Sequence, residues 1–448
     1  MKNVVTQYLE LLRQNIDRAS LVSIATKLKI AGYSNKFRRP YVKKNELKEI
    51  ILKELKKRSI RKSSSVSDFR SKLRGGKRKR SRSESSNVSS FKSSPFSPIH
   101  YKVESANTLR LPKVQRLIAI GDIHGDLRAI IRALKVAGVI PLHIPENNNK
   151  IDVKNVPWIG KNTVVVQLGD QIDRARPTSW CNDCVDEEIP DDEGSDLKIM
   201  NLMDNLHLKA QQNGGAVISI LGNHELMNAK GDFRYVSLKE FEEFGLVLSG
   251  NETDDDDKTV PFGYKERMSV FVPGGIMAKR MAYTRFCVAQ VGSWLFVHGG
   301  ITPKIALKYS IDHLNYITKE WLKGNHTQKI VNAFDDIFEN DDNDMSPYWT
   351  RLFSEYEDWN EDRMKYLFNT TLKILNSKNK GVPIKGMIVG HSPQYMWDRK
   401  INSSFNNRLW RVDVGMSRAF GPDHEQREYR KVQVLEIKND NQFTILTE

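Results

Sequence analysis

Short apolar runs alternate with helical patterns through the last three quarters of the chain. These runs are RLIAI, TVVVQL, AVISIL, SWLFVH, KGMIVG, RLWRVDV, KVQVLEI and FTILT, all between residues 116 and 447. Runs of this length that are rich in Val and Ile predict buried strands. Strands that alternate with helices are typical of an α/β protein. We therefore predict an α/β domain over residues 113–448.

The pattern before residue 113 is different. Residues 1–58 contain two amphipathic helical patterns, VVTQYLELLRQNI and NELKEIILKELKKR. The stretch from LVSIATKLKI to KKNELKEII resembles the small helix, extended loop and helix modules of the SAP and Rho amino-terminal type, which bind nucleic acid. A basic helical pair that contacts protein fits equally well. Residues 59–112 are rich in Ser, Arg and Lys and poor in large apolar residues, so we predict a disordered linker.

The net charge of +15 comes entirely from the amino-terminal part. The first hundred residues hold 26 Lys and Arg against 7 Asp and Glu, whereas the rest hold 44 against 48. This asymmetry makes nucleic acid or another polyanion a candidate partner of the appended region. The cluster from Lys77 to Arg80 resembles a nuclear localisation signal, although a phosphate-contacting patch or a solvated linker would have the same composition.

Cysteine content and hydropathy indicate the compartment. Three cysteines in 448 residues do not make a disulfide framework. No apolar stretch reaches the roughly 18 residues of a membrane span, and the amino terminus lacks the apolar centre of a signal peptide. We predict an intracellular protein of the nucleus or cytoplasm without membrane contact.

Polar side chains follow five of the predicted strands at the points where the strands end. Open α/β sheets bind ligands beyond the carboxyl ends of their strands. Residues from all five ends are therefore expected to meet at one site. In chain order, these residues are Asp122 and His124, then Asp170, then Asn223, then His298, then His391.

This set of residue types suits a pair of metal ions. Carboxylates, amide oxygens and imidazoles bind hard and borderline divalent cations, and manganese, iron and zinc all fit. Two ions about 3.5–4 Å apart can share one carboxylate, clamp a phosphoryl group and lower the pKa of a bridging water. Gly beside each ligand allows the backbone to approach the ions closely. The pattern predicts a hydrolytic centre with two metals.

The motifs GDxHG, GDxxDR, GNHE, HGG and GH occur here in that order. As a set they resemble the calcineurin-like metallophosphoesterases, in the phosphoprotein phosphatase branch. Within that branch the chain is most similar to the Shewanella-like, bacterial-type Ser/Thr phosphatases, including relatives from large DNA viruses of the iridovirus type. The resemblance covers about residues 114–440. It implies a four-layer sandwich with two mixed β-sheets flanked by helices.

The resemblance also assigns the ligands of each metal. Asp170 is expected to bridge the two ions because it belongs to both sets. The first set is Asp122, His124 and Asp170, and the second is Asp170, Asn223, His298 and His391.

Four further residues match catalytic positions of the resembling phosphatases. Arg174 and Arg351 match the two arginines that hold the phosphate, and guanidinium groups bind phosphate oxygens bidentately. His224 matches the general acid that protonates the leaving alkoxide, and Asp173 matches the carboxylate that orients this imidazole. Asp126 is not a ligand in the pattern, and we interpret it as a helix N-cap.

The function implied by the resemblance is hydrolysis of phosphoserine and phosphothreonine by direct attack of metal-bound hydroxide, with phosphotyrosine as a further substrate. Three alternatives remain. A nuclease-like phosphodiesterase of the superfamily is disfavoured because such relatives end in GHxH, where this chain has Pro393. A dinucleoside polyphosphate hydrolase shares most of the motifs. A degenerate, nucleic-acid-tethered binding protein is disfavoured because every expected ligand is present.

Two features depart from the resembling pattern. Ala175 follows Arg174 where the pattern has Gly, so the loop that presents Arg174 is expected to differ. Cys181 and Cys184 form a CxxC motif, but closed zinc sites need four ligands and only Cys287 remains as a further thiol. An exposed loop without metal is the preferred interpretation.

Overall fold

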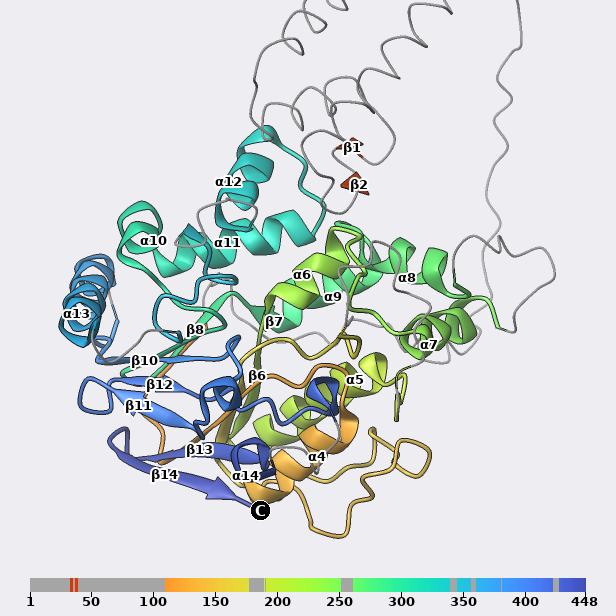
Figure 1. The fold of residues 1–448 in the computed structure, drawn as a ribbon, viewed down its shortest axis with the longest axis horizontal. Helices are drawn as coiled ribbons and strands as arrows, with labels where there is room; N and C mark the ends of the chain where they lie inside the picture. Colours follow the sequence, from red (N-terminus) through yellow and green to blue (C-terminus); the bar gives the residue numbers. More distant parts are fainter. Residues whose placement is uncertain are drawn as a thin grey trace, which may run out of the picture. The chain divides into compact units, whose positions relative to one another are not determined.

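The computed structural model describes residues 33–34, 37–38, 109–176, 189, 191–250, 261–338, 345–355, 360–379, 381–421 and 427–448 (Figure 1). The chain divides into two compact units, residues 1–94 and 95–448, and each is described by itself. In the first unit, β1 (Tyr33–Ser34) pairs antiparallel with β2 (Phe37–Arg38). The predicted helices of residues 1–58, the cluster at residues 77–80 and nearly all of the predicted linker lie outside the described residues.

The second unit contains two mixed six-stranded sheets. In the first sheet, four neighbouring strands run parallel, the next strand is antiparallel to them, and the edge strand beyond it is antiparallel to that one. Its order is β14 (Gln442–Thr447), β13 (Gln433–Lys438), β4 (Arg116–Ile120), β5 (Val164–Gln167), β6 (Ala216–Ile220) and β7 (Arg285–Phe286). In the second sheet the order is β11 (Asn402–Ser404), β12 (Leu409–Arg411), β10 (Gly386–Val389), β9 (Trp294–Val297), β8 (Val288–Val291) and β3 (Leu109–Leu111).

Every predicted apolar run forms a strand, which confirms the α/β prediction. The strands that the pattern did not predict are β3, β7, β8 and β11, each of two to four residues. Strands this short carry too few positions to show an alternation. Because β3 pairs with β8, the sheet begins at Leu109, before the predicted domain start at residue 113.

The two sheets pack face to face, and helices cover their outer faces. Strand β9 shows the layering, because successive side chains of a strand point to opposite faces. Trp294 and Phe296 belong to the same core cluster as the strands of the first sheet, so they face that sheet. Leu295 and Val297 belong to the core under the helices. The observed layers are those of the predicted sandwich, with two mixed sheets flanked by helices.

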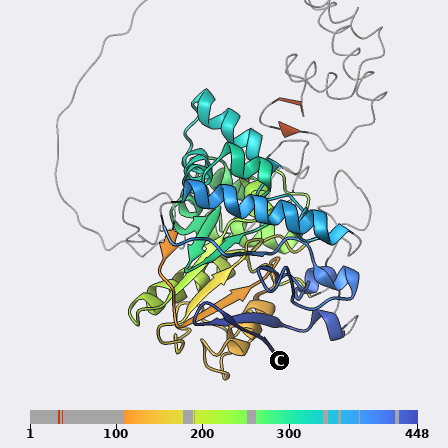
Figure 2. The same cartoon turned by 90° about the vertical axis from the view of Figure 1, so that its left-hand side faces the viewer.

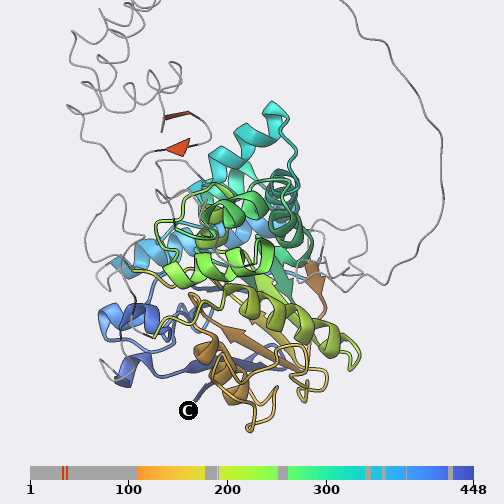
Figure 3. The ribbon, with the colours of Figure 1, turned by 90° about the vertical axis from the view of Figure 1, so that its right-hand side faces the viewer.

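The helices of the second unit fall on both sides of the sandwich (Figures 2 and 3). Buried side chains of α4 and α5 pack against the first sheet, and those of α13 pack against the second. The α-helices are α4 (Leu127–Val136), α5 (Asp196–Gln211), α6 (Asn223–Ala229), α7 (Leu238–Leu248), α8 (Tyr264–Phe271), α9 (Ile276–Thr284), α10 (Pro303–Lys308), α11 (Ile311–Leu322), α12 (Gln328–Phe338), α13 (Glu361–Lys378) and α14 (Arg427–Arg430). Two 3₁₀ turns are η4 (Gln394–Trp397) and η5 (Arg418–Phe420).

The first helix after β4 begins as predicted. The Asp126 carboxylate accepts a hydrogen bond of 3.0 Å from the backbone N–H of Ala129, which makes Asp126 the N-cap of α4. The same carboxylate accepts from the Arg418 guanidinium at 2.9 and 3.0 Å. Asp126 is therefore a structural residue that fixes the turn after the first ligands.

Candidate metal centre

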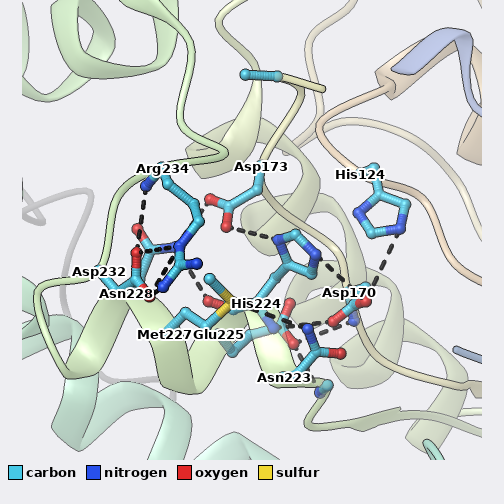
Figure 4. Close-up of polar contacts among 12 residues, drawn as sticks. His124, Asp170, Asp173, Asn223, His224, Glu225, Met227, Asn228, Asp232 and Arg234 are labelled. Atoms are coloured by element: carbon cyan, nitrogen blue, oxygen red, sulfur yellow. Dashed lines mark hydrogen bonds and ion pairs between the residues drawn. The ribbon is translucent and has the colours of Figure 1, made fainter. Parts of the chain in front are cut away.

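The six predicted metal ligands lie together at one edge of the sandwich, and all are buried. The loops after β4, β5 and β6 bring three ligand groups from the first sheet, and the loops after β9 and β10 bring the two histidines of the second. Parallel neighbours end at the same edge, so their following residues meet there. Figure 4 shows part of this cluster, with Asp170 between the side chains of its neighbours.

Three of the predicted ligand atoms surround His298 Nε2 at the second sheet. Its Nε2 lies 2.9 Å from Asn223 Oδ1, 3.1 Å from His391 Nδ1 and 3.3 Å from Asp170 Oδ2. Its Nδ1 lies 2.7 Å from the carbonyl oxygen of Leu168, which can only accept, so Nδ1 carries the proton and Nε2 offers a lone pair.

Lone pairs that converge in this way repel one another unless a cation lies between them. Two ligands held about 2.1 Å from a common ion stand about 3 Å apart, which matches the observed spacing. The donor set of oxygen and imidazole nitrogen atoms fits a manganese, iron or zinc ion.

The other ligand set shares the same carboxylate oxygen. His124 Nε2 lies 3.8 Å from Asp170 Oδ2 and 4.0 Å from Asp122 Oδ2. Asp122 Oδ1 is buried and has no hydrogen-bond partner among the described residues. Asp170 Oδ2 thus faces both sets, which is the position that a bridging ligand requires.

The pKa values of the two central carboxyl groups are shifted in opposite directions. Burial raises the pKa of Asp122 well above its usual value, and the nearby carboxylates of Asp413 and Asp170 raise it further. Burial also opposes ionisation of Asp170, but His298 and then His224 hold the pKa of that carboxyl well below its usual value. Bound divalent cations would favour the ionised form of every carboxylate in such a cluster.

The backbone around the ligands is strained. Four site residues other than Gly adopt positive φ, namely His124 at 48°, Asp170 at 50°, Asp173 at 76° and His391 at 69°. Each such conformation costs of the order of 1–3 kcal/mol and persists only where the surroundings fix it. The Glu225 carboxylate supplies part of that support, because it accepts hydrogen bonds from the backbone of Asp170 and its neighbours.

Two glycines allow the close approach that the sequence predicted. A Cβ on Gly222 would lie 2.0 Å from Asp170 Oδ1, and a Cβ on Gly390 would lie 2.4 Å from Asp122 Oδ1. Neither position has room for a methyl group, because real Cβ contacts are never this short. The ligand carboxylates therefore depend on these two positions.

The predicted acid lies beside Asp170, the predicted bridging ligand. His224 Nδ1 is 2.8 Å from Asp173 Oδ2, and its Nε2 is 3.9 Å from Asp170 Oδ2 (Figure 4). The other oxygen of Asp173 accepts from Asn228 Nδ2 at 2.8 Å and from Arg267 Nη2 at 3.3 Å. The structure thus brings His224 and Asp173 together, with the imidazole Nε2 toward the metal ligands.

The two predicted arginines have different surroundings. The Arg351 side chain is 43% exposed, pairs with Glu355 and lies close enough to help lower the pKa of His391, after burial and His298. The Arg174 side chain is fully buried. Its Nη1 lies 3.6 Å from Asp126 Oδ2 and 3.4 Å from Ser417 Oγ. Its role on the phosphate stays a prediction.

Sequence reasoning missed three supporting residues. Glu225 belongs to GNHE and occupies the third helical position after Gly222, where a capping-box Glu is expected. Asn228 lies one helical turn after His224, so the spacing i, i+4 could have placed both on one face. Arg267 comes from α8, and no local signal links it to Asp173. Cys181 and Cys184 lie outside the described residues.

Comparison with known proteins decides the family. The profile of the calcineurin-like phosphoesterases matches residues 115–425. This chain belongs to that family. It is 29% identical to Shewanella-like protein phosphatase 2 of Arabidopsis thaliana over 75% of this chain and 79% of that protein. It is 33% identical to an uncharacterized protein of Acanthamoeba polyphaga mimivirus, over 55% of this chain and 98% of that protein.

Another curated relative agrees with the predicted subgroup. Shewanella-like protein phosphatase 1 of Plasmodium berghei is 29% identical over 72% of this chain and 73% of its own length. Among solved structures, a cold-active protein-tyrosine phosphatase of a Shewanella species matches with a TM-score of 0.48 and 16% identity, over 76% of this chain and 84% of that chain. The predicted resemblance is confirmed, and this calcineurin-like phosphoesterase is a hydrolase of phosphoric esters. Within the described residues, no helix has the length and apolarity to cross a membrane.

Proposed function

We propose that this calcineurin-like phosphoesterase is a two-metal phosphomonoesterase that removes phosphate from phosphoserine and phosphothreonine in proteins, with phosphotyrosine as a further substrate. The observation that carries the proposal is the position of Asp170 Oδ2, which faces both buried ligand sets and also lies 3.9 Å from His224 Nε2. A reacting phosphate would therefore lie between the ions and a proton donor.

The ligand sets have distinct tasks in this proposal. Asp122, His124 and Asp170 hold one ion, while Asp170 with the second-sheet ligands holds the other. Bound manganese, iron or zinc supplies positive charge for the phosphate oxygens and acidifies a water molecule. The protein contributes a fixed ligand geometry, because all six side chains are buried and their loops are tied to strand ends.

His224 is the proposed general acid. The Asp173 carboxylate accepts from its Nδ1–H and stabilises the protonated imidazole, so the Nε2–H is free to protonate the leaving alkoxide. Alkoxides are poor leaving groups, and this proton lowers the barrier to their departure. Arg351 is partly exposed and lies close enough to His391 to affect its pKa, and in this proposal its guanidinium would bind phosphate oxygens.

A monoesterase is favoured over a phosphodiesterase or a dinucleoside polyphosphate hydrolase. Pro393 stands where the nuclease-like relatives have a second His, and proline offers no ligand atom. The Ser392 hydroxyl before it lies 2.7 Å from Ser354 and also hydrogen bonds with Glu355. Nucleic acid remains a proposed partner of the amino-terminal region, separate from this centre.

The test is a rate comparison with the full chain in manganese, iron and zinc. Phosphate release from an aryl phosphomonoester and from a phosphopeptide panel is expected to need metal and to exceed hydrolysis of a bis-aryl diester or DNA. Asp170→Asn and His224→Asn are the inactive controls. A diesterase rate equal to or above the monoesterase rate would contradict the proposal.

A second measurement concerns the basic region. Deleting residues 1–94, the first compact unit, is expected to leave turnover of small substrates intact and to remove most salt-sensitive polyanion binding. The deletion stops before Leu109 because β3 belongs to the sheet. Unchanged DNA retention by the truncated chain would count against a nucleic-acid tether.

A further inference from the structure

The segment after β12 lies against the loop of the first ligand set and carries Arg418 at the start of η5. The Arg430 side chain anchors this segment, because its Nε donates to the Gly415 carbonyl and its Nη2 to the Ser417 carbonyl, both at 2.7 Å. The Ser417 hydroxyl donates in turn to the carbonyl oxygen of His124 at 3.3 Å. Arg418 therefore belongs to a segment that is fixed beside the metal centre.

Arg418 fills the Asp126 carboxylate with hydrogen bonds. Asp126 Oδ2 accepts from the Arg418 backbone N–H at 2.7 Å and from its Nε at 3.0 Å. Oδ1 accepts from Arg418 Nη2 at 2.9 Å and from the Ala129 N–H at 3.0 Å. A carboxylate has about four lone-pair sites, so these four hydrogen bonds use its capacity. The same Nη2 also donates to Glu193 Oε1 at 2.5 Å, which gives Arg418 a second carboxylate partner.

Arg174 is the other guanidinium next to Asp126, and it makes no hydrogen bond with that carboxylate. Its Nη1 lies 3.6 Å from Asp126 Oδ2, beyond hydrogen-bond distance, and donates weakly to Ser417 Oγ at 3.4 Å. Its Nε and Nη2 are buried and have no hydrogen-bond partner among the described residues. Unpaired buried donors cost free energy unless a ligand accepts from them. These two donors fit the phosphate role that the resemblance predicts for Arg174.

The backbone of Arg174 is held independently of its side chain. Its N–H donates to both carboxylate oxygens of Glu240, at 2.9 and 3.1 Å. Glu240 is fixed in turn at the start of α7, where it also accepts from the Ser237 N–H at 2.8 Å. A change at Arg418 should therefore act on the direction of the Arg174 guanidinium and leave its loop in place.

We propose that Arg418 is a positioning residue for phosphate binding. By occupying Asp126, it prevents that carboxylate from forming a closed ion pair with Arg174, so Arg174 Nε and Nη2 stay available to the phosphate. The inference rests on the proposed phosphomonoesterase function, because it concerns binding of that same substrate. Without the Arg418 side chain, Asp126 loses two hydrogen bonds beside the Arg174 guanidinium. Guanidinium and carboxylate groups pair bidentately, which would take these donors away from the phosphate.

The test measures binding of inorganic phosphate to the manganese-loaded full chain by isothermal titration calorimetry. Arg418→Met is expected to weaken binding about 10- to 100-fold, the range for loss of a hydrogen bond to a charged group. Arg116→Met is the matched control, because it also removes a partly buried ion pair, with Glu436, at the amino-terminal end of β4. The control should bind phosphate as the native chain does.

A double variant separates positioning from structural support. Adding Asp126→Asn to Arg418→Met removes the charge that would capture Arg174, while Asn still serves as an N-cap. The double variant should therefore recover most of the lost phosphate affinity, whereas a second structural defect in the same place would deepen the loss. In steady-state kinetics on an aryl phosphomonoester, KM should follow the dissociation constant across the series.

Thermal melts check that each variant folds. If Arg418→Met does not fold, Arg418→Gln, which keeps one side-chain donor, replaces it in the same comparison. Native-like phosphate binding by the folded single variant would overturn this assignment alone, and so would a double variant that binds no better than the single one. Failure of the native chain both to turn over the ester and to bind phosphate would overturn the proposed function and this inference together.

Discussion

Arg267 is the buried cation behind the proposed acid, and its removal should have a large effect. Its Nη2 lies 2.7 Å from Asp196 Oδ2 and 3.3 Å from Asp173 Oδ1, and its Nε donates to Asn228 at 2.7 Å. Both side chains of the Arg267 and Asp196 pair are fully buried. Breaking a buried ion pair from one side costs about 3–5 kcal/mol, because the remaining charge stays desolvated.

We therefore expect Arg267→Met to lower the free energy of unfolding by about 3–5 kcal/mol at pH 8, where Asp196 is mostly ionised in the native chain. Methionine retains much of the apolar bulk that packs near Phe244 and Phe271, so the loss reports the charge rather than a cavity. Arg234→Met is the matched control. The Arg234 side chain is 48% exposed and pairs with Asp232, and such a pair contributes at most about 1 kcal/mol.

The stability of the native chain should depend on pH through the Asp196 carboxyl group. Burial raises the pKa of Asp196 from 3.8 to about 7, so the folded chain keeps a proton that the unfolded chain releases. Stability therefore falls as the pH rises toward 7. Without the Arg267 cation this pKa rises further, and the fall should continue through pH 8.

Urea unfolding of the native chain and both variants at pH 6, 7 and 8 measures these effects. The gap between the native chain and Arg267→Met should widen with pH, whereas the gap for Arg234→Met should stay constant. A loss below about 1 kcal/mol for Arg267→Met, or a gap that narrows with pH, would refute the reasoning about this buried charge.

Three further predictions concern the centre. Asp173→Asn should lower kcat by about 10²- to 10⁴-fold with a smaller change in KM, because the proposed acid loses its orienting carboxylate. Steady-state kinetics test this prediction, with Asp232→Asn as the matched control. Gly222→Ala should abolish metal-dependent turnover, because its Cβ would overlap the Asp170 carboxylate, whereas Gly381→Ala, whose nearest contact is 3.5 Å, should remain active. Removal of metal with a chelator should lower the melting temperature, and added manganese should restore that temperature, because an ion that binds only the folded state stabilises the folded chain. Scanning calorimetry measures this shift, and Asp170→Asn should not show it.

The sequence by itself determined the strands and the polar residues that follow their ends. Apolar runs of four to six residues need burial on both faces, and the five that end in Asp, Asn or His occupy the two sheets as predicted. The N-cap at Asp126 is equally local, because the carboxylate and the N–H that it accepts from lie three residues apart. Patterns within one short segment were sufficient for these features.

Only the tertiary structure decided how the site is supported. Arg267 approaches Asp173 from 94 residues away, and Ser417 approaches Arg174 from 243 residues away. The burial of Arg174 against Asp126 follows from loops that fold together from separate segments. Contacts between distant segments depend on how the sheets and helices pack. That packing cannot be predicted from the order of residues within one motif.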